Sequence, residues 1–181
     1  GARKPYASLM RTRTFTPRAN DPDHLLAELS RHIEVVCARA REHGLSGKTL
    51  SFFLKTQSFR YEGATLKLSR ATNVPDELLG LVRERFADLY RKNVPYRACG
   101  ATLSDLSPVR GVQLDLFDTT LRIERWERIY EEVDGLNVRF GRPIVHLASS
   151  VRLLERARAR SAGGKEDDYA RLGIPFIGEV A

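Results

Sequence analysis

The sequence predicts an α+β fold, in which two helices cover one face of a four-stranded sheet and a helical extension follows. Two observations predict this class. Four segments have the composition or the apolar–polar alternation of half-buried strands, and two others repeat apolar residues at the spacing of an amphipathic helix. Their order is strand-helix-strand-strand-helix-strand, which places the four strands in one sheet and leaves its second face open.

The first strand and the first helix are expected near the N-terminus. Residues 1–7 are a short basic lead, which we interpret as a linker from upstream domains, and residues 8–16 have the threonine and aromatic content of a strand. Asn20-Asp21-Pro22-Asp23 then provides a cap residue, a proline for the first helical turn and an acid near the positive end of the helix dipole. The apolar stripe that follows ends at His43-Gly44, where the helix is expected to stop.

The remaining strands and the second helix follow without a long interruption. Residues 48–56 and 64–70 alternate as strands do, and residues 57–63 are expected to join them as a hairpin loop. Asn73-Val74-Pro75 opens a second helix, which ends before Asn93-Val94-Pro95. Residues 96–106 complete the sheet as its last strand.

The open face of this sheet is expected to be flat, basic and rich in hydrogen-bonding groups. The two-residue period of a strand collects Lys55, Thr65, Lys67 and Thr102 on it. The first strand has two possible orientations, because both of its sides mix polar and apolar residues. One side carries Ser8, Met10, Thr12 and Thr14, and the other carries Leu9, Arg11, Arg13 and Phe15.

Composition limits the functional classes. The chain has 181 residues, 42% of them hydrophobic, enough for one substantial domain with an ordinary core. The net charge of +7 favours a polyanionic partner over the alternative of a solvated mixed surface. Apolar runs stay below the about 18 residues of a membrane helix, so no membrane partner is expected. Cys37 and Cys99 are isolated, which indicates reduced core cysteines of a cytoplasmic protein. A start at Gly1 without methionine suggests a piece of a longer protein.

Residues 107–120 are expected to be a loop with a short anchor-rich segment at its centre. Leu114, Leu116 and Phe117 would fill apolar pockets of another protein, and the Gln113 amide would fix the register. The alternative is an edge strand with Val112, Leu114 and Leu116 on one face. Residues 121–181 are expected to form a helix-strand extension: an amphipathic helix over 121–140, a short strand over 143–149 and a partly flexible tail.

Three motifs give the chain a resemblance to a known family: Arg-Thr-Arg-Thr-Phe-Thr at 11–16, Tyr-Arg-Ala-Cys-Gly-Ala-Thr-Leu-Ser at 96–104 and Gln-Leu-Asp-Leu-Phe at 113–117. In this order of strands and helices, the chain resembles the C-terminal region of a bacterial Y-family translesion DNA polymerase of the DNA polymerase IV type. The resemblance implies that residues 8–106 are the little finger domain, which binds DNA. It also implies that Gln113, Leu114, Leu116 and Phe117 bind the sliding clamp, the beta subunit of the replicative polymerase.

The resemblance further implies contacts with duplex template-primer DNA. Ser8, Arg11, Thr12 and Thr14 on the first strand, and Arg97, Ala98 and Thr102 on the last, match contact positions of the family. Ala98 departs from the pattern, because some members have a second basic residue there. Charge and parity alone add Arg13, Lys55, Arg60 and Lys67, with a solvated surface position as the alternative for each basic residue. Contacts of this kind hold phosphates without reading sequence.

The catalytic domains of the family would precede Gly1. Their grouped carboxylates are absent from this sequence, so we expect no catalytic residue, no metal site and no cofactor in this fragment, and Mg²⁺ in the absent catalytic domain. The acidic pairs Asp167-Asp168 and Glu131-Glu132 lie in linker and surface-helix contexts. The four histidines show no ligand spacing.

These observations predict the non-catalytic, DNA-binding and clamp-tethering region of a DNA-directed DNA polymerase that acts in translesion synthesis and DNA repair. The alternative is a catalytically inactive adaptor of a mutasome, with the extension after residue 120 recruiting other proteins. A third interpretation is an RNA-binding sheet domain. Its aromatic platform is poorly formed in the sequence, where Phe53 is the main outward ring.

Overall fold

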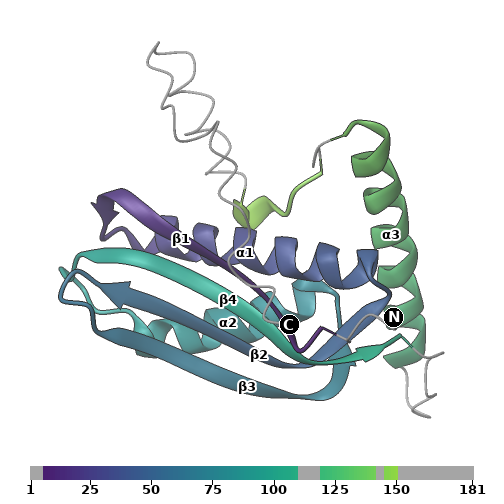
Figure 1. Cartoon of the computed structure of the whole chain (residues 1–181), viewed down its shortest axis with the longest axis horizontal. Helices are drawn as coiled ribbons and strands as arrows, with labels where there is room; N and C mark the ends of the chain where they lie inside the picture. The colour runs from purple at the N-terminus through teal and green to yellow at the C-terminus, as the bar shows by residue number, and fades with distance from the viewer. Residues whose placement is uncertain (1–5, 110–118, 142–144, 151–181) are drawn as a thin grey trace.

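The computed structural model describes residues 6–109, 119–141 and 145–150 (Figure 1). In chain order, the elements within these residues are β1 (Ser8–Ala19), α1 (Pro22–Glu42), β2 (Leu45–Thr56), β3 (Tyr61–Thr72), α2 (Pro75–Leu89), β4 (Tyr96–Pro108) and α3 (Thr119–Arg139). The predicted order of strands and helices is confirmed, and so is the α+β class.

The four strands form one antiparallel sheet in the order β1-β4-β2-β3. Helices α1 and α2 lie together behind this sheet in Figure 1, with α1 against β1, β4 and β2 and α2 against β3. When helices cover only one face of a sheet, apolar and polar residues alternate along each strand, because only every second side chain enters the core. The opposite face is not covered by α1 or α2 and is therefore open for binding.

The two helices begin and end where the local sequence predicts. Asp21 caps α1 by accepting a hydrogen bond from the Asp23 N–H, at 3.2 Å, and Pro22 occupies the first turn. Gly44 follows the helix with a φ of +63°, a left-handed conformation that glycine adopts without strain. At α2, the Thr72 hydroxyl accepts from the N–H of Val74, the residue before the helix, at 3.1 Å, and Pro75 occupies the first turn.

The core lies between the helices and the inner face of the sheet. On α1 the side chains of Leu25, Leu29, Ile33, Val36 and Cys37 are fully buried. They meet the inner rows of the sheet, which contain Leu50, Leu54, Cys99, Ala101 and Leu103. Both cysteines are free thiols in this core, as the sequence indicated.

Each of the four strands extends beyond its predicted bounds, and the differences at β3 and β1 bear on the open face. β3 begins at Tyr61, so residues 61–63 belong to a strand and not to the hairpin loop. The turn is tight because the Thr56 N–H donates to the Arg60 carbonyl at 2.9 Å, and the Thr56 hydroxyl accepts from the Arg60 N–H at 3.1 Å. β1 continues past Pro17 to Ala19, which pairs with Tyr96 after an irregularity in the register.

The described part of the extension, residues 119–141 and 145–150, packs on the helices. Arg41 of α1 donates to the two carboxylate oxygens of Asp134 in α3, at 2.6 and 3.0 Å. The Tyr130 hydroxyl bonds the carboxylate of Asp76 at the start of α2, and the Arg41 guanidinium lies 4.4 Å from the Tyr130 ring centroid. This contact places α3 at the end of the helical layer (Figure 1).

The prediction of a short strand over 143–149 is wrong for the residues described. Residues 145–147 are irregular and 148–150 are helical. Glu34 of α1 explains the difference, because its carboxylate accepts from the Leu147 N–H at 2.9 Å and from the Ser150 hydroxyl at 2.7 Å. A strand would pair its backbone N–H groups with a neighbouring strand. In this segment the Leu147 N–H pairs with the Glu34 side chain instead.

Candidate nucleic-acid interface

The open face presents side chains from all four strands in rows that cross the sheet. Strand register gives three consecutive rows: Met10, Thr102, Ser51 and Thr65; Thr12, Gly100, Phe53 and Gly63; and Thr14, Ala98, Lys55 and Tyr61. Most of these side chains are small or polar. The hydroxyls of Ser51 and Thr65 are 3.0 Å apart and form a hydrogen bond. No other element in the described part of the chain packs on these rows.

Two glycines keep the middle of this face flat. A Cβ atom on Gly100 would lie 2.6 Å from Cε1 of Phe53 and 2.7 Å from Cγ2 of Thr12. A Cβ atom on Gly63 would lie 2.8 Å from the Phe52 carbonyl oxygen. Side chains at these two positions would therefore push the Phe53 ring or the neighbouring strand away. Their absence lets the ring lie across the sheet.

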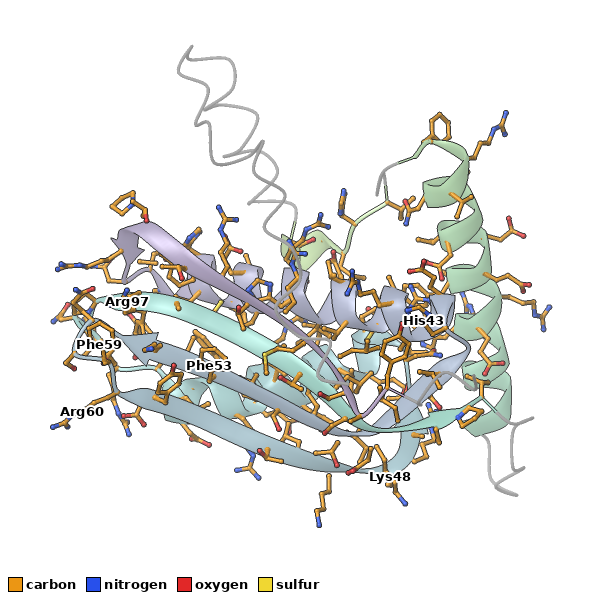
Figure 2. All side chains as sticks on the ribbon, in the orientation of Figure 1. His43, Lys48, Phe53, Phe59, Arg60 and Arg97 are labelled. Atoms are coloured by element: carbon orange, nitrogen blue, oxygen red, sulfur yellow. The ribbon has the colours of Figure 1, made fainter. Side chains whose placement is uncertain are left out.

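One end of the face carries a group of rings and cations that we name the hairpin cluster: Phe53, Lys55, Phe59, Tyr61 and Arg97. The Lys55 Nζ donates to the Tyr61 hydroxyl at 2.7 Å and lies 5.0 Å from the Phe59 ring centroid. The Arg97 guanidinium lies 4.2 Å from the same centroid. The rings of Phe53 and Tyr61 are 5.3 Å apart. Figure 2 shows Phe59 and Arg97 together at this end of the sheet, with Phe53 further along it.

A surface hollow of about 480 Å³ adjoins the hairpin cluster. It lies between the end of β1 and the β2–β3 turn, and Arg97 belongs to both the hollow and the cluster. Its lining mixes apolar residues, Phe15 and Pro17, with the polar residues Thr14, Thr16, Arg18 and Gln57. The volume is in the range of small-molecule sites, about 300–1,000 Å³.

The structure settles the orientation of β1. Ser8, Met10, Thr12 and Thr14 face the open side, while Leu9 and Phe15 are buried beneath the helices. Arg11 and Arg13 share the side of Leu9 and turn toward α1. Arg13 forms an ion pair with Glu28, with Nη1 2.9 Å from Oε1, although the arginine side chain remains 56% exposed.

Burial controls the ionisation of the groups around this ion pair. It raises the pKa of Glu28, which Arg13 opposes by charge and hydrogen bonding. Burial also lowers the pKa of His32 to about 3, and the charges of Arg11, Arg13 and Arg31 act in the same direction. The pKa of Arg11 is lowered by its own burial and by the neighbouring arginines. His32 is therefore neutral at physiological pH.

The predicted DNA contacts thus fall into three groups. Ser8, Thr12, Thr14, Lys55, Lys67 and Thr102 lie on the open face. Arg60 and Arg97 lie at its hairpin end (Figure 2), and Arg11 and Arg13 lie on the helix side of the edge strand. Gln113, Leu114, Leu116 and Phe117, which the sequence predicts to bind the clamp, lie outside the described residues.

The sequence interpretation missed two members of the hairpin cluster. Phe59 and Tyr61 are 60% and 61% exposed, and they extend the aromatic surface beyond Phe53. For Tyr61 a signal was present, because Tyr61, Gly63, Thr65 and Lys67 share one parity. The prediction of a loop over residues 57–63 left Tyr61 out of the strand, so this shared parity was not considered. Phe59 has no such signal, since its place depends on a turn with a φ of 65°.

None of the described helices is both long and apolar enough to span a bilayer. Within the described ranges, no three His, Cys, Asp or Glu side chains gather in a way that could hold a metal ion.

Comparison with known proteins identifies relatives of the chain. Residues 7–116 match the model of the impB/mucB/samB family C-terminal domain. The DNA polymerase IV of Moorella thermoacetica is 29% identical over 118 residues, which cover 65% of this chain and 29% of that protein. DNA polymerase IV 2 of Bacillus subtilis is 30% identical over 141 residues, covering 76% and 32%. The chain thus spans about a third or less of these relatives.

Similar solved structures are also found, at low identity. An insertion ternary complex of Dbh DNA polymerase has a TM-score of 0.48 and 13% identity, covering 56% of this chain and 29% of that one. A complex of the beta-clamp processivity factor and the little finger domain of PolIV has a TM-score of 0.43 and 17% identity, covering 60% and 97%. From the family match, which takes in more than half of the chain, we conclude that this chain belongs to the impB/mucB/samB family through its C-terminal domain, the little finger domain of Y-family DNA polymerases.

Proposed function

We propose that this chain is the DNA-binding and clamp-tethering region of a Y-family DNA polymerase that acts in translesion synthesis and DNA repair. The observation that carries the proposal is the open face itself. It belongs to the C-terminal domain of this family, and its four strands present hydroxyl, small and basic side chains in register. A sheet face of this composition suits the phosphate backbone of duplex template-primer DNA.

Contact with phosphates follows from the chemistry of the face. Lys67 and Arg60 are exposed cations, and Lys55 is half-buried. The Thr102 hydroxyl can donate to a phosphate oxygen, and so can one hydroxyl of the Ser51–Thr65 pair, since the other donates within the pair. Such contacts carry no sequence information, which suits an enzyme that must follow any template. Arg13 contributes from the strand edge, where its exposed side reaches beyond the Glu28 ion pair.

The second part of the proposal is the tether. Gln113, Leu114, Leu116 and Phe117 form a peptide for the sliding clamp, with the three apolar side chains as anchors. A peptide this short is expected to bind on the order of micromolar. A clamp that encircles the same DNA raises the effective concentration of the peptide, so a weak contact is sufficient.

The whole protein would place its catalytic domains and their Mg²⁺ ions upstream of this region and act in the cytoplasm. The relatives named above are DNA polymerases IV of which this chain covers about a third or less. A second candidate is a catalytically inactive adaptor of a mutasome, and the additional helix α3 favours it. The upstream sequence separates the two, since only a polymerase needs carboxylates that hold two metal ions.

Duplex binding as a function of salt tests the first part. The chain should bind blunt duplex DNA of any sequence, and the logarithm of its affinity should fall linearly with the logarithm of salt concentration. Lys67→Ala should weaken binding uniformly and lower the slope by about one. Arg83→Ala removes an exposed cation from α2, on the helix side, and serves as the matched control. Equal effects of the two substitutions would refute the assignment of the open face.

A clamp titration tests the tether separately. The chain should bind the sliding clamp, and Leu116→Ala with Phe117→Ala should abolish that binding while duplex affinity stays unchanged. Unchanged clamp affinity in this double variant would remove the tether from the proposal and leave the DNA-binding assignment intact.

A further inference from the structure

We propose that the hairpin cluster binds an unpaired nucleotide of single-stranded DNA, whose base stacks on the exposed rings of Phe59 and Tyr61. The inference rests on the proposed function and refines it, because it divides the open face into two parts. The part of the face away from the hairpin cluster takes the duplex, and the hairpin end takes unpaired template strand beside it.

The exposure of the two rings is the first argument. Phe59 and Tyr61 are 60% and 61% exposed, although the core beneath the sheet contains other aromatic side chains that are nearly fully buried. Neither ring fills a packing space in the core. Duplex DNA gives such rings no partner, because its bases are stacked on one another and its outer surface is phosphate and sugar. A single strand offers free base faces, and stacking on aromatic side chains is how proteins hold them.

The cations around the rings are the second argument. Arg97 lies 4.2 Å and Lys55 5.0 Å from the Phe59 centroid, and Lys55 is also 4.5 Å from the Tyr61 centroid. A nucleotide that stacks on either ring would therefore have a positive charge within reach of its phosphate. Among the described residues, Lys55 donates to the Tyr61 hydroxyl at 2.7 Å, which leaves two of its three protons for a phosphate.

The hollow beside the hairpin cluster is the third argument. Its volume of about 480 Å³ suits a nucleotide, and Arg97 connects it to the Phe59 ring. The Gln57 amide can both donate to and accept from a base edge, and the Thr14 and Thr16 hydroxyls can do the same. Figure 2 places Phe59, Arg60 and Arg97 at this one end of the molecule.

Binding of oligo(dT) by the whole chain tests the inference independently of duplex binding. Phe59→Ala and Tyr61→Ala should each lower the affinity for oligo(dT) about 5- to 150-fold, the range for loss of one stacked base. The affinity for blunt duplex should change less than about twofold. Phe140→Ala is the matched control, because that ring is 57% exposed and lies just after α3. Tyr61→Phe should keep the oligo(dT) affinity within about threefold, because it retains the ring.

A fluorescent ring gives a direct reading of stacking. In Phe59→Trp the new emission should be quenched by oligo(dT) and not by blunt duplex, with the wild-type chain supplying the background of Trp126 in α3. Unchanged oligo(dT) affinity in both alanine variants, or tighter binding of oligo(U) than oligo(dT), would overturn the inference. Loss of blunt-duplex binding by the wild-type chain would instead overturn the proposed function, so the two failures are distinct.

Discussion

Acid should destabilise this domain through His32, whose ring lies under β1. The side chain is 1% exposed, and neither ring nitrogen has a hydrogen-bond partner among the described residues. The groups that face it are Arg11 and Arg13 of β1 and Arg31 of α1, all positive. A proton on His32 would therefore add a buried charge to three like charges, which the folded state resists.

The magnitude follows from the pKa of His32, which is lowered from 6.5 to about 3, first by burial. The unfolded chain takes up the proton as pH falls through 6.5, and the folded chain does not until pH nears 3. The contribution of His32 to the free energy of unfolding is thus fully present above pH 6.5. Below that pH it decreases by about 1.4 kcal/mol per pH unit. At pH 4.5 the loss from this residue should be about 3 kcal/mol, equivalent to roughly 5–11 °C in Tm for a chain of this size.

Thermal denaturation at pH 7.5 and 4.5 measures this loss. His32→Leu replaces the ring with an apolar side chain of similar volume, and its Tm should fall less between the two pH values than that of the wild-type chain. Glu28 acts in the opposite sense, because its raised pKa favours the protonated carboxyl in the folded state as pH falls. Glu28→Gln should therefore enlarge the acid loss. Equal acid losses in the wild-type chain and His32→Leu would refute the reasoning.

Three further outcomes are expected. Asp134→Ala removes the carboxylate that holds Arg41, so amide hydrogen exchange in α3 should accelerate about tenfold or more, with the core strands unaffected. Gly63→Ala should cost about 1–3 kcal/mol in a denaturant titration, because its Cβ would meet the Phe52 carbonyl oxygen at 2.8 Å; an unchanged midpoint would contradict the flat-face argument. Burial raises the pKa of Cys37 to about 12, so a thiol reagent at pH 8 should modify it only after denaturant is added.

Local sequence was sufficient to predict the helices and the order of the elements. Asp21 and Pro22 start α1, Gly44 ends it, and the apolar stripe between them can be buried in only one way. The strands that alternate cleanly were also placed on the correct faces. These features depend on residues that are close in the sequence, so they can be predicted without information about tertiary contacts.

Only the tertiary structure decided which residues meet across the sheet. β1 could not be oriented from its own residues, because both sides mix polar and apolar groups. The structure turns Arg13 toward Glu28, a contact between a strand and a helix that no short-range pattern encodes. The hairpin cluster has the same origin, since Phe59, Tyr61 and Arg97 come together through strand pairing and one left-handed turn residue. The alternation of residues along a strand specifies which face of the sheet each side chain occupies. The register between strands specifies which side chains are its neighbours on that face.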